Sequence, residues 1–158
     1  MAVTNVVAMV QQLQPDEAAR LFGTFSDNLQ TDRASTIRLL KAQNFVSLAL
    51  AMHPARPLRD QTAAYLQLLV QDGDLEVRTA ASKNLEAFCA RLDGVTLQSQ
   101  ILPVLSEICQ PPPPGEISPN QPVREHVAEN ICSLASVLGR EATLNELMRL
   151  LKMFMSDE

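Results

Sequence analysis

The stretch DGDLEVRTAASKNLEAFCARL, residues 72–92, decides the fold because its pattern recurs along the chain. It has an acidic turn, then the pair Val77-Arg78, and then apolar residues at helical spacing, so it predicts one amphipathic helix. The same aliphatic-Arg pair occurs at Ile37-Arg38 and at Val123-Arg124. Apolar residues follow the aliphatic position at offsets 8, 11 and 15 in each copy: Phe45, Leu85 and Ile131; Leu48, Phe88 and Leu134; Met52, Leu92 and Leu138. These offsets lie on one face of a helix, which indicates one buried face per copy.

The copies are spaced by 40 and 46 residues, a range typical of two-helix solenoid repeats. A first helix is predicted upstream of each turn. Equivalent positions of this helix lie ten residues before the turn, and they are occupied by Phe22, Thr62, Ile101 and Leu147. One helix pair cannot cover its own apolar face and must stack on its neighbours. The sequence therefore predicts an all-α fold, a right-handed solenoid of stacked antiparallel helix pairs.

The repeat frame divides this single solenoid segment into units. We expect full repeats at residues 15–53, 57–93 and 96–139, and half repeats at residues 1–14 and 142–158. The third repeat contains a Pro-rich insertion, residues 111–122, which we expect to be an exposed irregular loop because proline lacks an amide donor and restricts the residue before it. The half repeats leave apolar residues without stacking neighbours, so we expect the isolated chain to associate.

Composition excludes several classes of function. The chain has 158 residues, of which 46% are apolar and 20% charged, with a formal net charge of −5 and scattered Lys and Arg residues. These values argue against nucleic-acid binding. The sequence has no apolar run long enough for a membrane span and no basic, apolar leader typical of a signal peptide.

Residues that could carry chemistry do not form a recognisable catalytic or metal-binding pattern. Cys89 aligns with Ala49 and Ala135 of the other copies, so we interpret it as a small buried hydrophobe rather than a redox or metal residue. The two histidines, His53 and His126, have no partners at metal-ligand spacing, and there is no glycine-rich phosphate loop or nucleophile elbow. We therefore expect a protein that is not an enzyme, holds no cofactor or metal, and occupies a reducing compartment: the cytoplasm or also the nucleus.

The turns carry a recurring acidic residue six positions before the Arg of the next helix, as in Asp32-Arg38 and Asp72-Arg78. Side chains that recur once per unit can pair between neighbours as a ladder, and Asp near a helix start can also cap free amide groups. We expect Arg78 to pair with the carboxylate of Asp72 or of Asp32. Turns of one kind line up along one edge of a solenoid, and this acidic edge favours protein docking over a merely solvated surface.

The repeat period, the Asp-to-Arg spacing and the aliphatic-Arg start resemble HEAT repeats. Four motifs, EVRTAAS, Phe88-Cys89, SQILP at residues 99–103 and Leu138-Gly139, further resemble the scaffolding (A) subunits of protein phosphatase 2A, most closely from about residue 69 to residue 158. This resemblance implies a non-catalytic scaffold that matches the middle of a longer family member. The partners that it implies are a phosphatase regulatory subunit, and also a catalytic subunit that the family binds through repeats outside this sequence.

The same resemblance implies protein binding at the turn positions that match the family, namely Asp32, Asp72, Asp74, Glu76 and Arg78. The insertion departs from the family pattern and disturbs the third docking turn. Two alternatives remain from the residues alone: a HEAT-repeat adaptor of another class, such as a transport or assembly factor, or a truncated gene product without an independent function.

Overall fold

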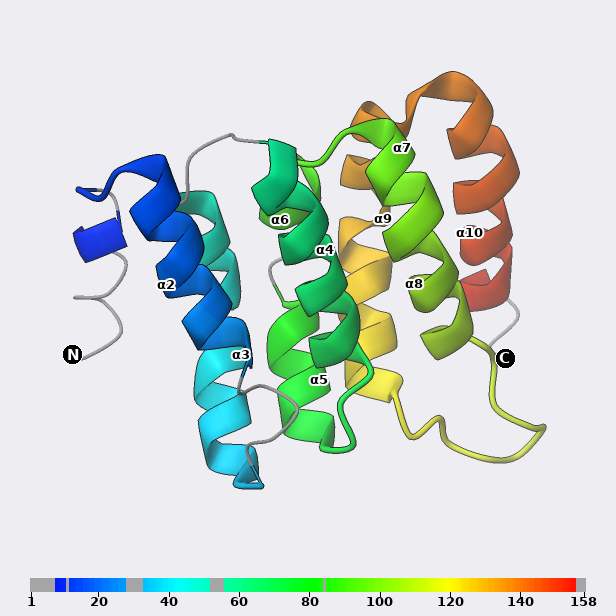
Figure 1. Ribbon diagram of the computed structural model, residues 1–158. Coiled ribbons are helices and arrows are strands. Elements are labelled where there is room, and N and C mark those ends of the chain that lie inside the picture. Colours follow the sequence, from blue (N-terminus) through cyan, green and yellow to red (C-terminus); the bar gives the residue numbers. More distant parts are fainter. Residues whose placement is uncertain (1–7, 11, 28–32, 52–55, 84, 156–158) are drawn as a thin grey trace.

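The computed structural model describes residues 8–10, 12–27, 33–51, 56–83 and 85–155 (Figure 1). Within these ranges all regular structure is helical and no strand occurs, which confirms the predicted all-α fold. The helices form two layers. One layer contains α2 (Pro15–Asp27), α4 (Arg56–Val70), the continuous run α7 (Gly94–Thr96), η1 (Leu97–Ile101) and α8 (Leu102–Ile108), and finally η2 (Thr143–Leu147) with α10 (Met148–Met155).

The other layer contains the helices that begin with the aliphatic-Arg pairs or continue them: α3 (Ser35–Ala51), α5 (Leu75–Ser82), α6 (Leu85–Cys89) and α9 (Gln121–Ala142). Within this layer α3 packs on α5, and α5 packs on α9, while α4 of the first layer packs on η1. Each unit is therefore a helix pair, and the pairs stack side by side as a solenoid (Figure 1).

The core lies between the layers, at the positions that the repeat frame selects. Offset 8 places Phe45, Leu85 and Ile131 in the core, and the first-layer positions Phe22, Thr62, Ile101 and Leu147 are buried as well. Ile37 is an exception and is 45% exposed, whereas the equivalent Val77 and Val123 are fully buried. Val77 lies in α5, which packs on both α3 and α9, whereas the described elements with the most extensive packing on α3 are α5 and α6.

The second-layer helix of the middle unit is described in two pieces. The sequence predicts one helix after the acidic turn of residues 72–92, and the structure describes it as α5, which ends at Ser82, and α6, which begins at Leu85. Residue 84 lies outside the described residues. Lys83, which follows α5, keeps helical dihedral angles (φ −60°, ψ −30°). The apolar face runs through both pieces, because Ala81, Leu85 and Phe88 are all buried.

Gly94 and Gly139 shape the start and the end of the third unit. Asp93 caps α7 by accepting hydrogen bonds from the Thr96 amide at 2.9 Å and the Thr96 hydroxyl at 3.1 Å. A Cβ on the next residue, Gly94, would lie 3.0 Å from the carbonyl oxygen of Val137, so this residue type permits close approach to α9. Gly139 (φ 76°, ψ 174°) breaks the helical path inside α9, which lets the chain turn from the second layer into η2 and α10.

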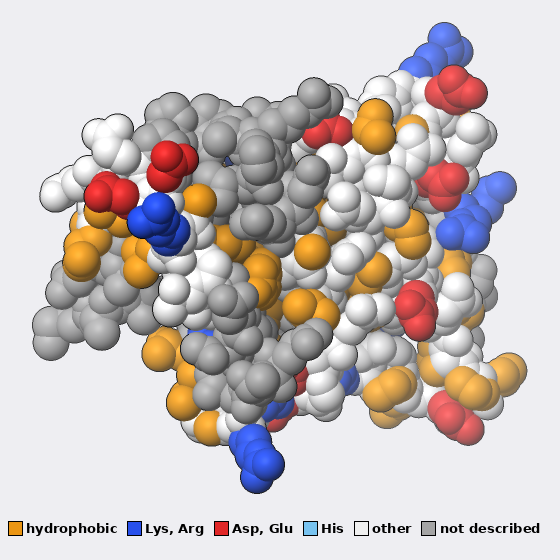
Figure 2. Space-filling model, in the orientation of Figure 1, with side chains coloured by type: hydrophobic (Ala, Val, Ile, Leu, Met, Phe, Trp, Pro, Cys, Tyr) orange, Lys and Arg blue, Asp and Glu red, His pale blue; other side chains and the backbone are white. Residues whose placement is uncertain are grey.

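The Pro-rich insertion lies at the same edge as the turn between α4 and α5 (Figure 1). Residues 110–120 are outside the helices, and Ile117 is 88% exposed, as expected for an irregular loop. The segment contains a β-turn in which the Glu116 amide donates to the Pro113 carbonyl at 3.0 Å and Gly115 has φ 84°, a combination typical of a type II turn. Apolar side chains gather in this corner of the surface (Figure 2).

The loop is anchored at its end rather than along its length. Ser118 is only 7% exposed, and its hydroxyl accepts a hydrogen bond from the Asn120 amide at 3.2 Å. Helix α9 then begins at Gln121, so the last two residues of the expected loop belong to the helix. Pro122 is tolerated there because the first turn of a helix does not use its amide groups.

Candidate functional site

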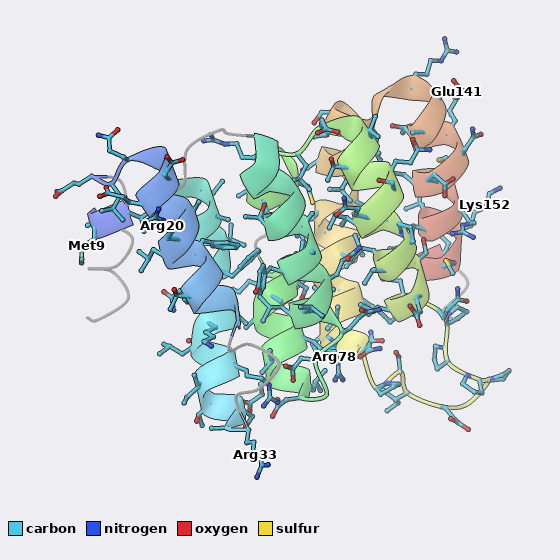
Figure 3. The ribbon with its side chains drawn as sticks, in the orientation of Figure 1. Met9, Arg20, Arg33, Arg78, Glu141 and Lys152 are labelled. Carbon is cyan, nitrogen blue, oxygen red and sulfur yellow. The ribbon has the colours of Figure 1, made fainter. Side chains whose placement is uncertain are left out.

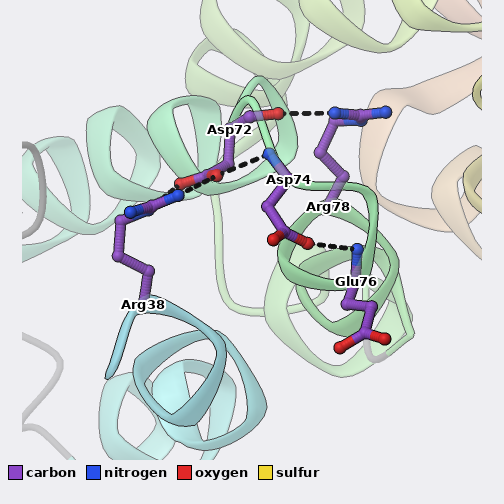
Figure 4. Close-up of polar contacts among 5 residues, drawn as sticks. All are labelled: Arg38, Asp72, Asp74, Glu76 and Arg78. Atoms are coloured by element: carbon purple, nitrogen blue, oxygen red, sulfur yellow. Dashed lines mark hydrogen bonds and ion pairs between the residues drawn. The ribbon is translucent and has the colours of Figure 1, made fainter. Parts of the chain in front are cut away.

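The turn between α4 and α5 is built by two aspartates with separate tasks. The carboxylate of Asp72 accepts a hydrogen bond from the Asp74 amide at 2.9 Å, which closes the turn. Asp74 has extended dihedral angles (φ −94°, ψ 127°) and caps α5, since its Oδ1 accepts from the Glu76 amide at 2.9 Å (Figure 4). The sequence DGD therefore forms a defined turn and not a flexible acidic segment.

Asp72 also binds the preceding repeat. Arg38, in the first turn of α3, donates from Nε to Oδ2 at 2.7 Å and from Nη2 to Oδ1 at 3.0 Å (Figure 4). The two side chains are 18% and 9% exposed, so the pair is largely shielded from water. A two-point contact of a guanidinium with a carboxylate fixes orientation as well as distance. The pair thus sets how two neighbouring helix pairs sit on each other.

The environment of Asp72 favours its ionised form. Burial by itself would raise the pKa of this carboxyl. The hydrogen bonds from Arg38 and from the Asp74 amide, together with the positive charges of Arg38 and Arg78, outweigh burial and hold the pKa below its ordinary value of 3.8.

Among the described residues Arg78 forms no ion pair with a carboxylate, which corrects the expected pairing with Asp72, while the alternative partner Asp32 lies outside those residues. Arg78 Nη1 donates to the backbone carbonyl of Asp72 at 2.7 Å, and the Asp72 carboxylate belongs to Arg38 instead (Figure 4). The ladder therefore runs from the Arg of one unit to the Asp of the following turn. Among the side chains that the structure describes, Arg78 Nε is the buried nitrogen without a hydrogen-bond partner.

The third copy of this arginine has a different environment. Arg124 is 2% exposed, and its Nη1 donates to the carbonyl oxygens of Cys109 and Gln110 at 2.8 and 2.5 Å. Its guanidinium also lies over the ring of Phe154, 5.7 Å from the centroid, in the cation–π range. The burial of Arg124 is not evident from its own segment of the sequence. A signal for it exists, because Arg124 occupies the same frame position as Arg38 and Arg78.

The predicted docking residues are brought together in part. Asp72, Asp74, Glu76 and Arg78 lie on one turn and the first turn of α5 (Figure 4). Asp32 falls outside the described residues. Asp72 uses both carboxylate oxygens within the chain, and Asp74 uses one as a cap, whereas Glu76 is exposed. Glu76 is therefore the acidic side chain of this group that is best placed to meet a partner.

A shallow pocket adjoins this turn on the side of the third repeat. It has a volume of about 550 Å³, and its lining includes Gln71, Gly73, Arg78, Glu107, Pro119 and Asn120. It is thus bounded by the α4–α5 turn, the end of α8 and the residues that precede α9. Figure 3 places Arg78 at this edge of the molecule, close to the start of α9.

A second depression lies on the layer formed by α3, α5 and α9. It has a volume of about 620 Å³, and Gln43, Glu76, Lys83 and His126 are among the side chains that line it. His126 Nδ1 is 3.1 Å from Ser82 Oγ, but Ser82 is fully buried and donates to the Thr79 carbonyl at 2.9 Å. Ser82 therefore accepts from His126, and this contact has a packing role instead of a nucleophilic one.

The buried thiols fit the hydrophobic interpretation. Burial raises the pKa of Cys89 to about 12, and it raises the pKa of Cys109 to about 11 against the opposing charge of Arg124. Thiols with such values are not thiolates at neutral pH, so they do not provide nucleophiles or metal ligands. Across the described part of the chain, no group of three or more His, Cys, Asp or Glu residues could hold a metal ion, and no helix is long and apolar enough to cross a membrane.

Stacked helix pairs, an Asp–Arg contact between units and a shared core place the chain in the class of α-solenoid repeat proteins. The chain is similar to a human protein, the beta isoform of the 65 kDa regulatory A-type subunit of serine/threonine-protein phosphatase 2A, with 32% identity over 118 residues. The match covers 72% of this chain and 18% of the human protein, so this chain spans under a fifth of that relative. No family model matches the chain.

At this level of similarity, the relative supports a HEAT-repeat scaffold. The relative is named as a regulatory subunit, not as the phosphatase itself, which agrees with the prediction that this chain is not an enzyme. The similarity therefore supports the class of protein, and the contacts of the turn residues show which side chains are exposed at the turn.

Proposed function

We propose that this chain is a segment of a protein phosphatase 2A-type scaffold that contacts a regulatory subunit through the edge formed by its turns. The observation that supports it best is the combination of the repeat fold with a 32% identical match to the A-type regulatory subunit of phosphatase 2A. The segment contributes rigid spacing and curvature, while the catalytic subunit binds repeats outside this sequence. We place this activity in the cytoplasm, where the free thiols Cys89 and Cys109 stay reduced.

Within this proposal the docking residues divide into two groups. Asp72 and Arg38 hold the turn edge in shape, because their charged groups satisfy each other. Glu76 and the free carboxylate oxygen of Asp74 supply the negative charge that faces outward. Exposed charges at the rim of an interface mainly change the association rate and its salt dependence. Asp32, on the preceding turn, is included in the proposal by its position in the repeat frame alone.

Binding to purified phosphatase 2A-type regulatory subunits tests this function directly. Surface-immobilised chain should capture a regulatory subunit, and Glu76→Lys should slow association several-fold at low salt with less effect at high salt. Glu86→Lys is the matched control, since Glu86 is also an exposed glutamate near a helix start but lies on α6, away from the turn. Absence of capture by any regulatory subunit would contradict the proposal and favour an adaptor of another class.

A further inference from the structure

We infer that the pocket beside Arg78 binds a carboxylate side chain of a partner protein, which takes the place of an aspartate missing from the third turn. The inference rests on the proposed function for the identity of the partner. It does not depend on that function for the chemistry of the pocket, which follows from the contacts of two equivalent arginines.

Arg38 and Arg78 occupy the same position in successive repeats, but among the described residues Arg38 forms an ion pair and Arg78 does not. The Asp72 carboxylate of the following turn satisfies Arg38 Nε and Nη2. One repeat later, Pro111 stands where the frame requires an aspartate. Arg78 makes a single hydrogen bond, to the Asp72 carbonyl, and its buried Nε has no partner among the described residues. A guanidinium with unused donors beside a protein interior is costly, because water cannot fully replace the lost acceptor.

The path of the Pro-rich insertion explains why the space beside Arg78 is open to a ligand. In the third repeat the chain leaves the turn position after Gln110 and returns at Ser118, instead of closing over Arg78 as a short turn. This detour leaves the pocket of about 550 Å³ between the α4–α5 turn and Pro119 and Asn120. One end of the Arg78 guanidinium is held on the Asp72 carbonyl, and the other end points away from that turn (Figure 4).

The chemistry of the pocket selects the occupant. A planar guanidinium matches a carboxylate in shape and charge, and the Arg38–Asp72 pair shows such a contact within the chain. At Arg78 the Nε is buried, so a ligand meets the outward end of the guanidinium. Glu107 lines the pocket too, and its Oε2 lies 3.4 Å from the amide nitrogen of the Gln71 side chain. Its negative charge repels any carboxylate that enters, so Arg78 can offset one acidic group of the partner but not a second. We therefore expect a single Asp or Glu side chain, flanked by uncharged or basic residues of the partner.

The first test uses the intact chain, sodium acetate as the carboxylate probe, and NMR of the arginine Nε–Hε groups. Sodium chloride at matched ionic strength serves as the reference. The Arg78 signal should shift progressively and saturate with acetate but not with chloride. Arg38, already bound to Asp72, and Arg20, an exposed arginine on α2, should not show a saturating shift. An Arg78 signal that follows Arg20 in both salts would overturn the inference.

The second test takes a regulatory subunit for the partner and separates this inference from the proposed function. Arg78→Gln should weaken capture about tenfold, as expected when a charge-assisted pair is lost, while Arg78→Lys should retain part of the affinity. Normal capture by Arg78→Gln would refute the partner carboxylate but leave the scaffold function intact. No capture by the wild-type chain, together with saturable acetate binding at Arg78, would refute the scaffold function but leave the pocket intact.

Discussion

Arg38 and Asp72 join two neighbouring repeats by a two-point contact, in which Nε and Nη2 of the arginine donate to different carboxylate oxygens at 2.7 and 3.0 Å. The same carboxylate accepts the Asp74 amide of its own turn at 2.9 Å. One side chain therefore orders the turn and positions it against the preceding unit. In a solenoid, the free energy of unfolding is approximately a sum of the stabilities of the repeats and of the interfaces between them. Asp72 therefore contributes to the stability of its own repeat and to that of the interface.

We expect Asp72→Asn to lower the free energy of unfolding by about 1–2 kcal/mol, because it removes a largely shielded charged pair. Urea unfolding measures this change, and Glu86→Gln, at an exposed glutamate on α6, is the control that should stay within about 0.5 kcal/mol of wild type. In a double-mutant cycle with Arg38→Gln, the two losses should be clearly less than additive. Additive losses would show that the contact does not couple the repeats.

Stability should also fall in acid because of Asp72. The folded-state pKa of this carboxyl is lowered from 3.8, so the unfolded chain takes up the proton at a higher pH than the folded chain does. The contribution is therefore complete above about pH 5 and is lost as pH falls through the folded-state pKa. Unfolding at a series of pH values should give a smaller acid loss for Asp72→Asn than for wild type. An equal loss in both proteins would assign the acid sensitivity to other carboxyls.

Gly94 and Gly73 offer a matched comparison of two glycines. A Cβ at Gly94 would lie 3.0 Å from the Val137 carbonyl oxygen, whereas a Cβ at Gly73 would have no atom within 4 Å. Gly94→Ala should lower the melting temperature by several degrees, since backbone atoms of α9 would have to move. Gly73→Ala should leave it nearly unchanged or slightly higher. Equal melting temperatures for both variants would show that α7 and α9 adjust without cost.

Much of the fold could be predicted because each repeat buries the same positions. Phe45, Leu85 and Ile131 share one offset and all lie in the core, so three weak local patterns support one another. The 45% exposure of Ile37 could not be predicted in this way, since the repeat pattern gives Ile37 the same position as the buried Val77 and Val123.

The sequence identified which residues lie in the candidate site but not which of them contact each other. The offset of six residues links Asp72 and Arg78 in the sequence and suggested that these two side chains pair. In the stacked structure the Asp72 carboxylate faces the arginine of the preceding repeat, 34 residues earlier. Stacking geometry, which no local spacing encodes, therefore decides the partner. The pocket beside Arg78 likewise depends on the path of the insertion, which composition predicts to be irregular without giving its direction.

Removal of residues 111–117 should leave the melting temperature nearly unchanged. These seven residues form a largely exposed segment, and the hydrogen bond from the Glu116 amide to the Pro113 carbonyl lies within the segment itself. The deletion keeps Gln110, whose carbonyl binds Arg124, and the buried Ser118. Long surface insertions cost little in stability, because the closure entropy of a loop grows slowly with its length.

Differential scanning calorimetry of the deleted and intact chains measures this effect. Leu134→Ala, which empties a core position of α9 that is 1% exposed, is the reference for a damaging change and should cost about 2–5 kcal/mol. A drop of many degrees on deletion, comparable with that reference, would mean that the Pro-rich segment packs on the solenoid. Retention of the melting temperature would instead show that the contacts of Arg124 and Ser118 stabilise the third repeat. The insertion would then contribute little to stability.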